Sequence, residues 1–319
     1  MRVVLTNLSN ELYEQSRFVL NNSAKKFGVQ EVYSYDFDEI KYTAFFSANR
    51  EILEQPTGLG YWLWKPYIIL EAMKRLSEGD IVIYSDCGIE IINDLEPLLE
   101  ICRAREPILL FGNANDSNSA WTKRDCFVLM DCDNESYWNS PHCDAAFSLF
   151  RKSEYSIRFL NDWLRFGSNK YIISDLENEC GLPNLPNYIA HRWDQSILSL
   201  LAQKYKLSLY RMPTQFGNHY KIHSARVQGE FNCVNQSDYS QVNYYFIIPY
   251  YNSHYGQLLD HHRKKNNSNS DHNTHQQSQY PNKGIRQYLK RGIKRLIKGM
   301  GINGKFFSKE TESYSRFLF

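Results

Sequence analysis

An aspartate that follows a short apolar segment is the first residue of this sequence with a recognisable chemical role. Residues 81–85 read Ile-Val-Ile-Tyr-Ser, which is typical of a buried strand, and Asp86-Cys87-Gly88 follows directly. In open α/β sheets, ligands bind just beyond the carboxyl ends of the strands. We therefore expect Asp86 and Gly88 to border a site in which the carboxylate holds a metal ion or a sugar. The alternative is that Asp86 only caps a turn.

A second segment, residues 58–66 (GLGYWLWKP), combines aromatic rings with one cation. Pro66 fits the first turn of a helix, where its missing N–H costs nothing, so Lys65 lies near a helix N-terminus, which also favours anions. Lys65, Trp64 and Tyr61 are thus candidates to contact a diphosphate or a nucleotide. Alternatively, Lys65 only reaches toward solvent from an aromatic cluster, and at least one tryptophan belongs to the core.

Diphosphate sites commonly hold their divalent metal with carboxylates in an Asp-x-Asp pattern. After Asp86, the second position of that pattern is Gly88, and the next carboxylate is Glu90. A complete Asp-x-Asp stands at residues 131–133, but the polar residues 134–136 (NES) follow it and favour a solvated turn. Asp86 therefore remains the preferred metal ligand.

Asp194 and Gln195 stand in the first turn of a predicted helix, residues 193–205, whose apolar residues recur at helical spacing. A carboxylate there either complements the helix dipole or acts as the base that takes a proton from a hydroxyl group. His191, three residues earlier, is a second candidate for the base.

Strands and helices alternate along the first 210 residues. We predict strands at 3–6, 31–35, 81–85, 108–111, 126–130, 145–150 and 207–210, and helices at 11–26, 66–76, 94–105, 153–166 and 193–205. Ser153 is a candidate N-cap, and Gly79 with Asp80 ends the second helix. The alternation predicts an α/β fold with a largely parallel, right-handed sheet flanked by helices.

The composition is that of a soluble globular protein whose charge is unevenly distributed. Hydrophobic residues make up 42% and charged residues 23% of the 319 residues, and the net charge is +2. Residues 261–319 carry 13 Lys and Arg against 3 Asp and Glu, which leaves the preceding residues acidic. Seven cysteines form no Cys-x-x-Cys pair, so neither a disulfide framework nor a zinc site is indicated. With no apolar signal peptide and no run of about 18 apolar residues, we expect a cytoplasmic protein.

Three parts of the chain differ in character. Residues 1–262 form the predicted catalytic domain. Residues 263–282 are too polar to bury a core and are predicted to be a disordered linker. Residues 283–319 begin with apolar residues at helical spacing among Lys and Arg, which predicts a basic amphipathic helix that binds an anionic membrane surface.

Two of the motifs above support a resemblance to a known family. The run GYWLWKP, then a helix, then GDIVIYSDCG resembles bacterial glycosyltransferases of the GT-A fold, which is Rossmann-like, that build capsular or O-antigen polysaccharide. The resemblance covers roughly residues 1–260. The downstream order is similar to the glycogenin-like and lipopolysaccharide galactosyltransferase-like families, with Asp-Ala-Ala at residues 144–146 where those families have Asn-Ala-Gly.

The resemblance implies a role for each matching residue. Asp86 would be the metal and diphosphate carboxylate, with Mn²⁺ or Mg²⁺ as the metal. Asp144 and Asp194 would contact the donor sugar or the acceptor and carry the catalysis. His219 or His223 would be a late ligand of the metal or the phosphate.

Two classes of function follow. The first is an enzyme that moves a hexose, by the resemblance galactose or galactofuranose, from a UDP-sugar to a lipid-linked surface glycan on the inner face of the cytoplasmic membrane. The second is a non-catalytic carbohydrate- or nucleic-acid-binding protein on a degenerate transferase scaffold. The acidic body argues against nucleic acid as a partner. Ionisable groups at Lys65, Asp86, Asp144 and Asp194, in apolar or aromatic surroundings, argue against a scaffold without activity.

Overall fold

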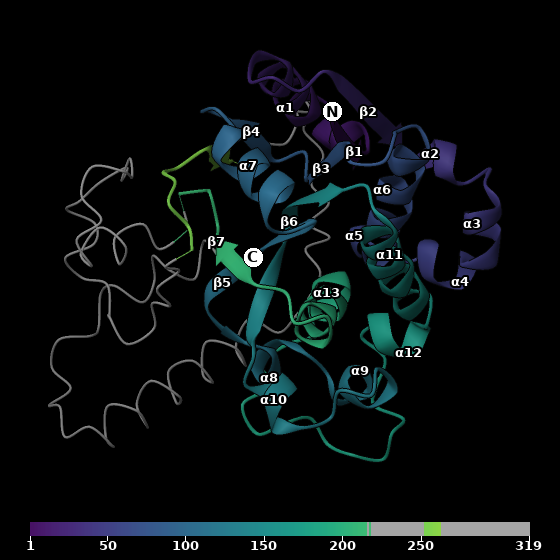
Figure 1. The fold of residues 1–319 in the computed structure, drawn as a ribbon. Helices are drawn as coiled ribbons and strands as arrows, with labels where there is room; N and C mark the ends of the chain where they lie inside the picture. The colour runs from purple at the N-terminus through teal and green to yellow at the C-terminus, as the bar shows by residue number, and fades with distance from the viewer. Residues whose placement is uncertain (216, 218–251, 263–319) are drawn as a thin grey trace, which may run out of the picture. The chain divides into compact units, whose positions relative to one another are not determined.

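A computed structural model describes residues 1–215, 217 and 252–262 of the chain. A six-stranded sheet forms its centre, with strand order β2-β1-β3-β6-β5-β7 (Figure 1). β6 is antiparallel to both of its neighbours, and the other pairs are parallel. The mostly parallel α/β sheet flanked by helices that the sequence predicts is therefore confirmed.

The strands are β1 (Val3–Ser9), β2 (Glu31–Asp36), β3 (Ile81–Ser85), β4 (Ile89–Ile91), β5 (Ile108–Ser117), β6 (Pro141–Arg151), β7 (Leu209–Arg211) and β8 (Leu259–His261). The helices are η1 (Glu11–Tyr13), α1 (Glu14–Lys26), α2 (Phe37–Ile40), α3 (Ala44–Ala48), α4 (Arg50–Leu53), α5 (Gly58–Tyr61), α6 (Trp64–Lys74), α7 (Glu96–Ala104), α8 (Asn118–Trp121), α9 (Arg124–Leu129), α10 (Glu135–Trp138), α11 (Glu154–Gly167), α12 (Lys170–Ile173) and α13 (Trp193–Lys204). β4 and β8 pair in a separate small sheet. None of the described helices has the length and hydropathy needed to cross a membrane.

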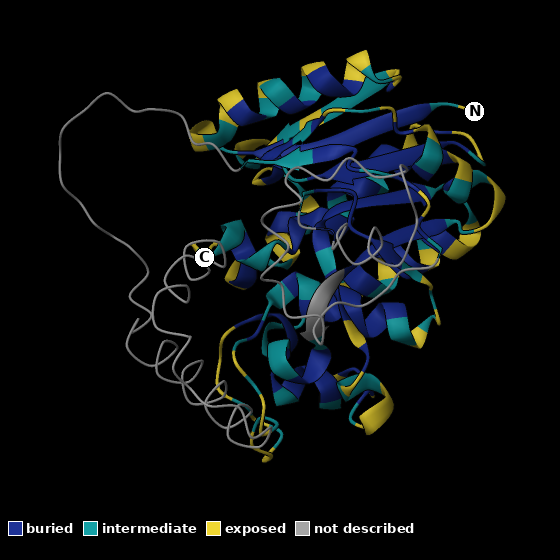
Figure 2. Cartoon of the chain, turned by 90° about the vertical axis from the view of Figure 1, so that its left-hand side faces the viewer, coloured by how far each residue is buried: buried dark blue, intermediate teal, exposed yellow. Residues whose placement is uncertain are grey.

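Two apolar cores cover the two faces of the sheet. One core contains the inner faces of α6, α11 and α13, and the other contains those of α1 and α7 together with β4. Every residue of β1 and β3 is buried, as expected for parallel strands that are covered on both sides. Figure 2 shows the same arrangement, with buried strands inside and exposed residues along the outer surfaces of the helices.

Several local predictions are confirmed, and one is wrong. Ser153 caps α11 by accepting a hydrogen bond from the N–H of Ser156, and Pro66 lies in the first turn of α6. The segment 126–130, however, is helical rather than extended. Cys126 and Met130 are both buried, whereas Leu129 is exposed, which is the i, i+4 spacing of a helix that packs one side against the core.

The strand order places a topological switch point at the carboxyl ends of β1 and β3. The connection from β1 to β2 passes through α1 on one face, and the return to β3 passes through α6 on the other face. Such a change of direction is where ligands bind in open α/β sheets. Because β6 is antiparallel, its first residues lie at this same edge, with Phe147 opposite Ser85.

Candidate active site

Lys65 lies at the centre of a buried group of charges. Its Nζ atom is 3.2 Å from Oδ2 of Asp194 and 3.4 Å from Oδ1 of Asp86, and it donates a hydrogen bond of 3.0 Å to the carbonyl oxygen of Ala145. Lys65 and Asp194 are each only 3% exposed. The structure thus brings together three predicted site residues from the start of α6, the end of β3 and the first turn of α13.

A left-handed turn before α6 positions Lys65. Leu59, Tyr61 and Trp62 have positive φ angles of 55°, 55° and 59°, and Gly58 and Gly60 share this conformation. A Cβ atom on Gly58 would lie 2.3 Å from the indole of Trp62, so only glycine leaves room for that ring. The turn directs Lys65 inward, where the rings of Trp62 and Tyr84 lie 5.9 and 5.4 Å from its Nζ atom.

The charges in this group act on one another. Burial lowers the pKa of Lys65, but Asp194 and Asp86 outweigh that effect, so its pKa is raised and the ammonium group stays charged. Burial raises the pKa of Asp194 to about 7, with Lys65 opposing and Asp86 adding to the shift. One carboxyl group at the site therefore exchanges its proton near neutral pH, as a general base requires.

Asp86 is held on two sides and remains partly open to solvent. The hydroxyl group of Tyr84 donates a hydrogen bond to its Oδ1, and its backbone N–H donates one of 2.7 Å to the carbonyl oxygen of Ala146. The Asp86 side chain is 29% exposed. Burial, with the charge of Asp86, keeps the pKa of Tyr84 well above its usual value, so the phenol remains a donor.

The first residues of β6 form the frame on which the site is assembled. The Gln195 amide donates a hydrogen bond of 2.6 Å to the carbonyl oxygen of Cys143, as Lys65 does to that of Ala145. Half-buried Asp144 accepts a hydrogen bond from the N–H of Ala146, and its charge helps to raise the pKa of Lys65. Predicted residues Asp144 and Gln195 therefore border the same group of charges.

Polar residues at the end of β1 were not among the predicted site residues. Asn7 and Asn10 each have a buried Oδ1 atom with no hydrogen-bond partner among the residues that the structure describes. Both stand at the carboxyl end of a strand that neighbours β3, so the rule that singled out Asp86 would also have found them. Unpartnered buried acceptors of this kind are costly unless a ligand or water satisfies them.

The remaining predicted residues have varied surroundings. Trp64 is 4% exposed and its Nε1 donates to the carbonyl oxygen of Gly58, which places the ring in the core, whereas Tyr61 is half-buried. Gly88 is buried, and its carbonyl oxygen accepts a hydrogen bond from the N–H of His262. His219 and His223 lie outside the described residues.

His191 has a structural environment. Its Nδ1 accepts a hydrogen bond from the N–H of Lys123, and its Nε2 lies 2.9 Å from the carbonyl oxygen of Ile172. Burial, with the charge of Lys123, lowers the pKa of His191 to about 3. The ring is therefore neutral and held between two backbone groups.

The second Asp-x-Asp pattern also has a structural explanation. Asp131 lies in the turn after α9 with a φ of 56°. Asp133 forms an ion pair of 2.9 Å with Arg124 and accepts a hydrogen bond from the indole of Trp138. These contacts fix the turn between α9 and α10.

A divalent metal fits this site only if the substrate supplies most of its ligands. Within residues 1–215, 217 and 252–262, no group of three or more His, Cys, Asp or Glu is placed to hold a metal ion. Asp86 offers a partly exposed carboxylate, and Mg²⁺ is commonly bound by one or two carboxylates together with substrate phosphates. The described residues thus provide one ligand of such a site.

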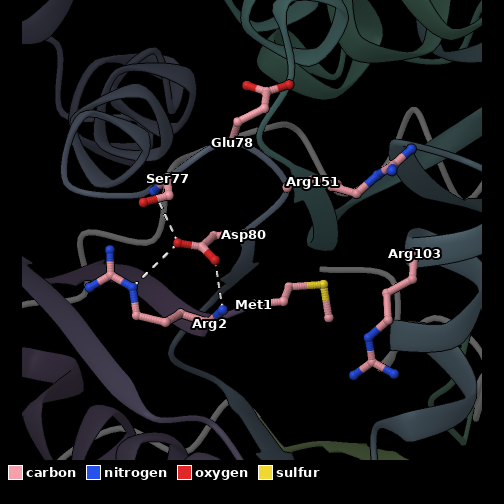
Figure 3. A pocket seen from close by; sticks show the side chains of 8 residues that line it. Met1, Arg2, Ser77, Glu78, Asp80, Arg103 and Arg151 are labelled. Atoms are coloured by element: carbon pink, nitrogen blue, oxygen red, sulfur yellow. Dashed lines mark hydrogen bonds and ion pairs between the residues drawn. The ribbon is translucent and has the colours of Figure 1, made fainter.

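The opposite edge of the sheet carries a pocket of about 530 Å³. Figure 3 shows its buried carboxylate, Asp80, which accepts hydrogen bonds from the backbone N–H groups of Arg2 and Ser77. These bonds and the charge of Arg2 hold the pKa of Asp80 below its usual value in spite of burial. Asp80 therefore stabilises the start of β3, at the end remote from Asp86.

Comparisons with known proteins find distant similarity to solved structures only. No family model and no curated protein matches the chain. Mouse xyloside xylosyltransferase 1, in its apo form, is similar with a TM-score of 0.43 at 12% identity, over 86% of this chain and 100% of that one. The bifunctional glycosyltransferase WbbM is similar with a TM-score of 0.36 at 11% identity, over 63% of this chain and 37% of that one. A glycosyltransferase involved in glycosylation of the major capsid of PBCV-1 is similar with a TM-score of 0.32 at 10% identity, over 60% of this chain and 82% of that one.

Proposed function

We propose that the chain is a GT-A glycosyltransferase that moves a hexose from a UDP-sugar to a glycan acceptor. The observation that carries the proposal is the contact of Lys65 with both Asp86 and Asp194 at the carboxyl edge of the sheet. A buried cation with two carboxylates is expensive to assemble. Its position at the switch point between the carboxyl ends of β1 and β3 supports a catalytic role rather than a purely structural one.

Each residue has a part in the proposed reaction. The C1–O bond between the hexose and the diphosphate breaks, and a bond forms between C1 and the acceptor oxygen. Asp194 takes the proton of the acceptor hydroxyl, which is the step that an inverting transferase needs. Lys65 holds Asp194 and Asp86 in place, and Asp144 binds hydroxyl groups of the donor hexose.

The diphosphate would lie at the carboxyl ends of β1 and β3. Asp86, whose side chain is 29% exposed, would hold Mg²⁺ or Mn²⁺ together with the diphosphate. A metal bound in this way neutralises the charge that develops on the leaving group. Galactose or galactofuranose is the proposed sugar, on the sequence resemblance described above.

The acceptor is proposed to be a lipid-linked surface polysaccharide. The support is the basic amphipathic sequence of residues 283–319, which suits the anionic inner face of a cytoplasmic membrane. Vesicle sedimentation with the full chain and with residues 1–262 tests this point. We expect anionic vesicles to retain the full chain only; retention of neither form would contradict it.

A donor screen tests the enzymatic proposal. Release of UDP from UDP-hexoses is measured with and without Mn²⁺, alongside thermal unfolding in the presence of each compound. We expect one UDP-sugar to raise the unfolding temperature and to be turned over by the wild type but not by Asp194→Asn. Stabilisation without any turnover would favour a carbohydrate- or nucleotide-binding protein instead.

A further inference from the structure

Three aromatic side chains, Tyr61, Trp62 and Trp193, cluster beside the charged group; we term them the aromatic platform. The ring centroids of Trp62 and Trp193 are 5.2 Å apart, and those of Tyr61 and Trp193 are 6.5 Å apart. All three side chains pack against the core and are only half-buried. Each therefore keeps part of its surface open to solvent.

The backbone of the aromatic platform is strained. Tyr61, Trp62 and Trp193 have φ angles of 55°, 59° and 50°. Left-handed backbone is unfavourable for a bulky L-residue, and such strain gathers at sites where side-chain placement serves a function. Two separate segments thus adopt unfavourable conformations at the point where their rings meet.

The aromatic platform adjoins the proposed base and has a polar rim. Trp193 immediately precedes Asp194, and the ring of Trp62 lies 5.9 Å from Nζ of Lys65. The Nε1 atom of Trp193 donates a hydrogen bond of 3.0 Å to Oδ2 of Asp175. The carboxylate of Asp175 is therefore fixed at the edge of the rings.

We propose that the aromatic platform binds the terminal hexose ring of the acceptor and that Asp175 accepts hydrogen bonds from its hydroxyl groups. The inference rests on the proposed function, because a base at Asp194 must lie within hydrogen-bond reach of the acceptor hydroxyl. The acceptor sugar then lies against the first turn of α13, where the platform is the neighbouring half-exposed surface. The C–H groups on one face of a pyranose pack on the negative face of an aromatic ring, and its hydroxyl groups need polar partners.

Kinetics of Trp193→Ala test the proposal. The acceptor probes are p-nitrophenyl β-galactoside, β-glucoside and α-mannoside, used with the UDP-sugar that the wild type turns over. We expect the KM for the acceptor to rise at least tenfold while the KM for the UDP-sugar stays within twofold, and Trp193→Phe to retain most of the affinity. The matched control is Trp138→Ala, since Trp138 is also half-buried and donates a 3.0 Å hydrogen bond to an aspartate, Asp133; its kinetics should not change.

Two results would overturn the proposal. A rise in the KM for the UDP-sugar alone would assign the aromatic platform to the donor, and unchanged constants would remove it from the site. If Trp193→Ala does not fold, Tyr61→Leu takes its place, with the same expected rise in the KM for the acceptor. If no probe is glycosylated, that result counts against the proposed function. The aromatic platform is then tested separately by saturation-transfer NMR, which compares the binding of the methyl glycosides of the same three hexoses to the wild type and to the variant.

Discussion

The ammonium group of Lys65 and the carboxyl group of Asp194 form an ion pair of 3.2 Å in which both side chains are almost completely buried. Asp86 adds a second carboxyl group at 3.4 Å. One cation faces two carboxyl groups, so full ionisation would leave an uncompensated negative charge away from water. Burial therefore keeps a proton on the group until the pH approaches neutrality, with Lys65 opposing and Asp86 adding to the raised pKa of Asp194.

Replacing Asp194 by Asn should abolish the pH dependence along with most of the activity. Because the pKa of Asp194 is about 7, the wild-type base is protonated in acid, and kcat/KM should fall about tenfold per pH unit below pH 7 and level off above it. General bases contribute about 10²–10⁴-fold, so kcat of Asp194→Asn should fall by that factor. A wild-type profile that is flat from pH 5 to 8 would exclude Asp194 as the base.

Replacing Lys65 by Met should destabilise the fold in a pH-dependent way. Breaking a buried ion pair costs about 3–5 kcal/mol. Without the ammonium group, the pKa of Asp194 in the folded state rises further above its value in the unfolded chain. The buried carboxyl group is neutral at pH 5.5, and keeping it neutral becomes more costly as the pH rises to 8. Urea unfolding should show a larger loss at pH 8 than at pH 5.5. Lys74→Met, on the exposed side of the same helix where Lys74 pairs with Glu71, should change the free energy of unfolding by less than about 0.5 kcal/mol.

Two aspartates from competing motifs can be separated by their kinetics. If Asp86 holds the metal, Asp86→Ala should raise the concentration of Mn²⁺ or Mg²⁺ required for UDP release by at least tenfold. Asp133→Ala should lower the melting temperature, because Arg124 and Trp138 lose a shared partner, yet leave the metal titration unchanged. The reverse result would assign the metal to residues 131–133.

A pair of glycine substitutions measures the importance of the turn before α6. Gly58→Ala should impair both stability and turnover, because the new Cβ atom would lie 2.3 Å from the indole of Trp62. Gly181→Ala is the control: its φ is also positive, at 74°, but no atom of the described part of the chain lies within 4 Å of the position that its new methyl group would take. It should cost only the backbone strain, about 1 kcal/mol. Equal effects of the two variants on turnover would show that the position of Trp62 is unimportant.

Part of the candidate site could be predicted from general rules about chains and sheets. Asp86 follows an apolar strand, and Lys65 precedes a proline at a helix start, so those rules make both candidates for one diphosphate site; the structure places them 3.4 Å apart. The position of Asp194 in the first turn of α13 is likewise confirmed. Its contact with Lys65 could not be predicted, because it depends on how α13 packs against β6.

Other features left no periodic signal. Trp62 and Trp64 are two positions apart and would share a side in an extended segment, but the left-handed residues leave Trp62 half-buried and Trp64 in the core. The short helix α9 has too few residues for its apolar pattern to differ from that of a strand. The hydrogen bond from the Tyr84 hydroxyl to the Asp86 carboxylate joins two side chains that are two positions apart at the end of β3. Whether such a bond forms depends on the local backbone geometry, which the residue types alone do not indicate.

The start of β6 holds its neighbours through main-chain atoms. Cys143, Ala145 and Ala146 offer carbonyl oxygens to Gln195, Lys65 and the amide of Asp86. Any amino acid supplies the same oxygen, but Cys143, Ala145 and Ala146 are themselves buried, so of these four consecutive residues the half-buried Asp144 is the one whose side chain can change without disturbing the core. Under the proposed function, the side chain of Asp144 is therefore the place on this stretch where recognition of the donor hexose can vary while the main-chain contacts persist.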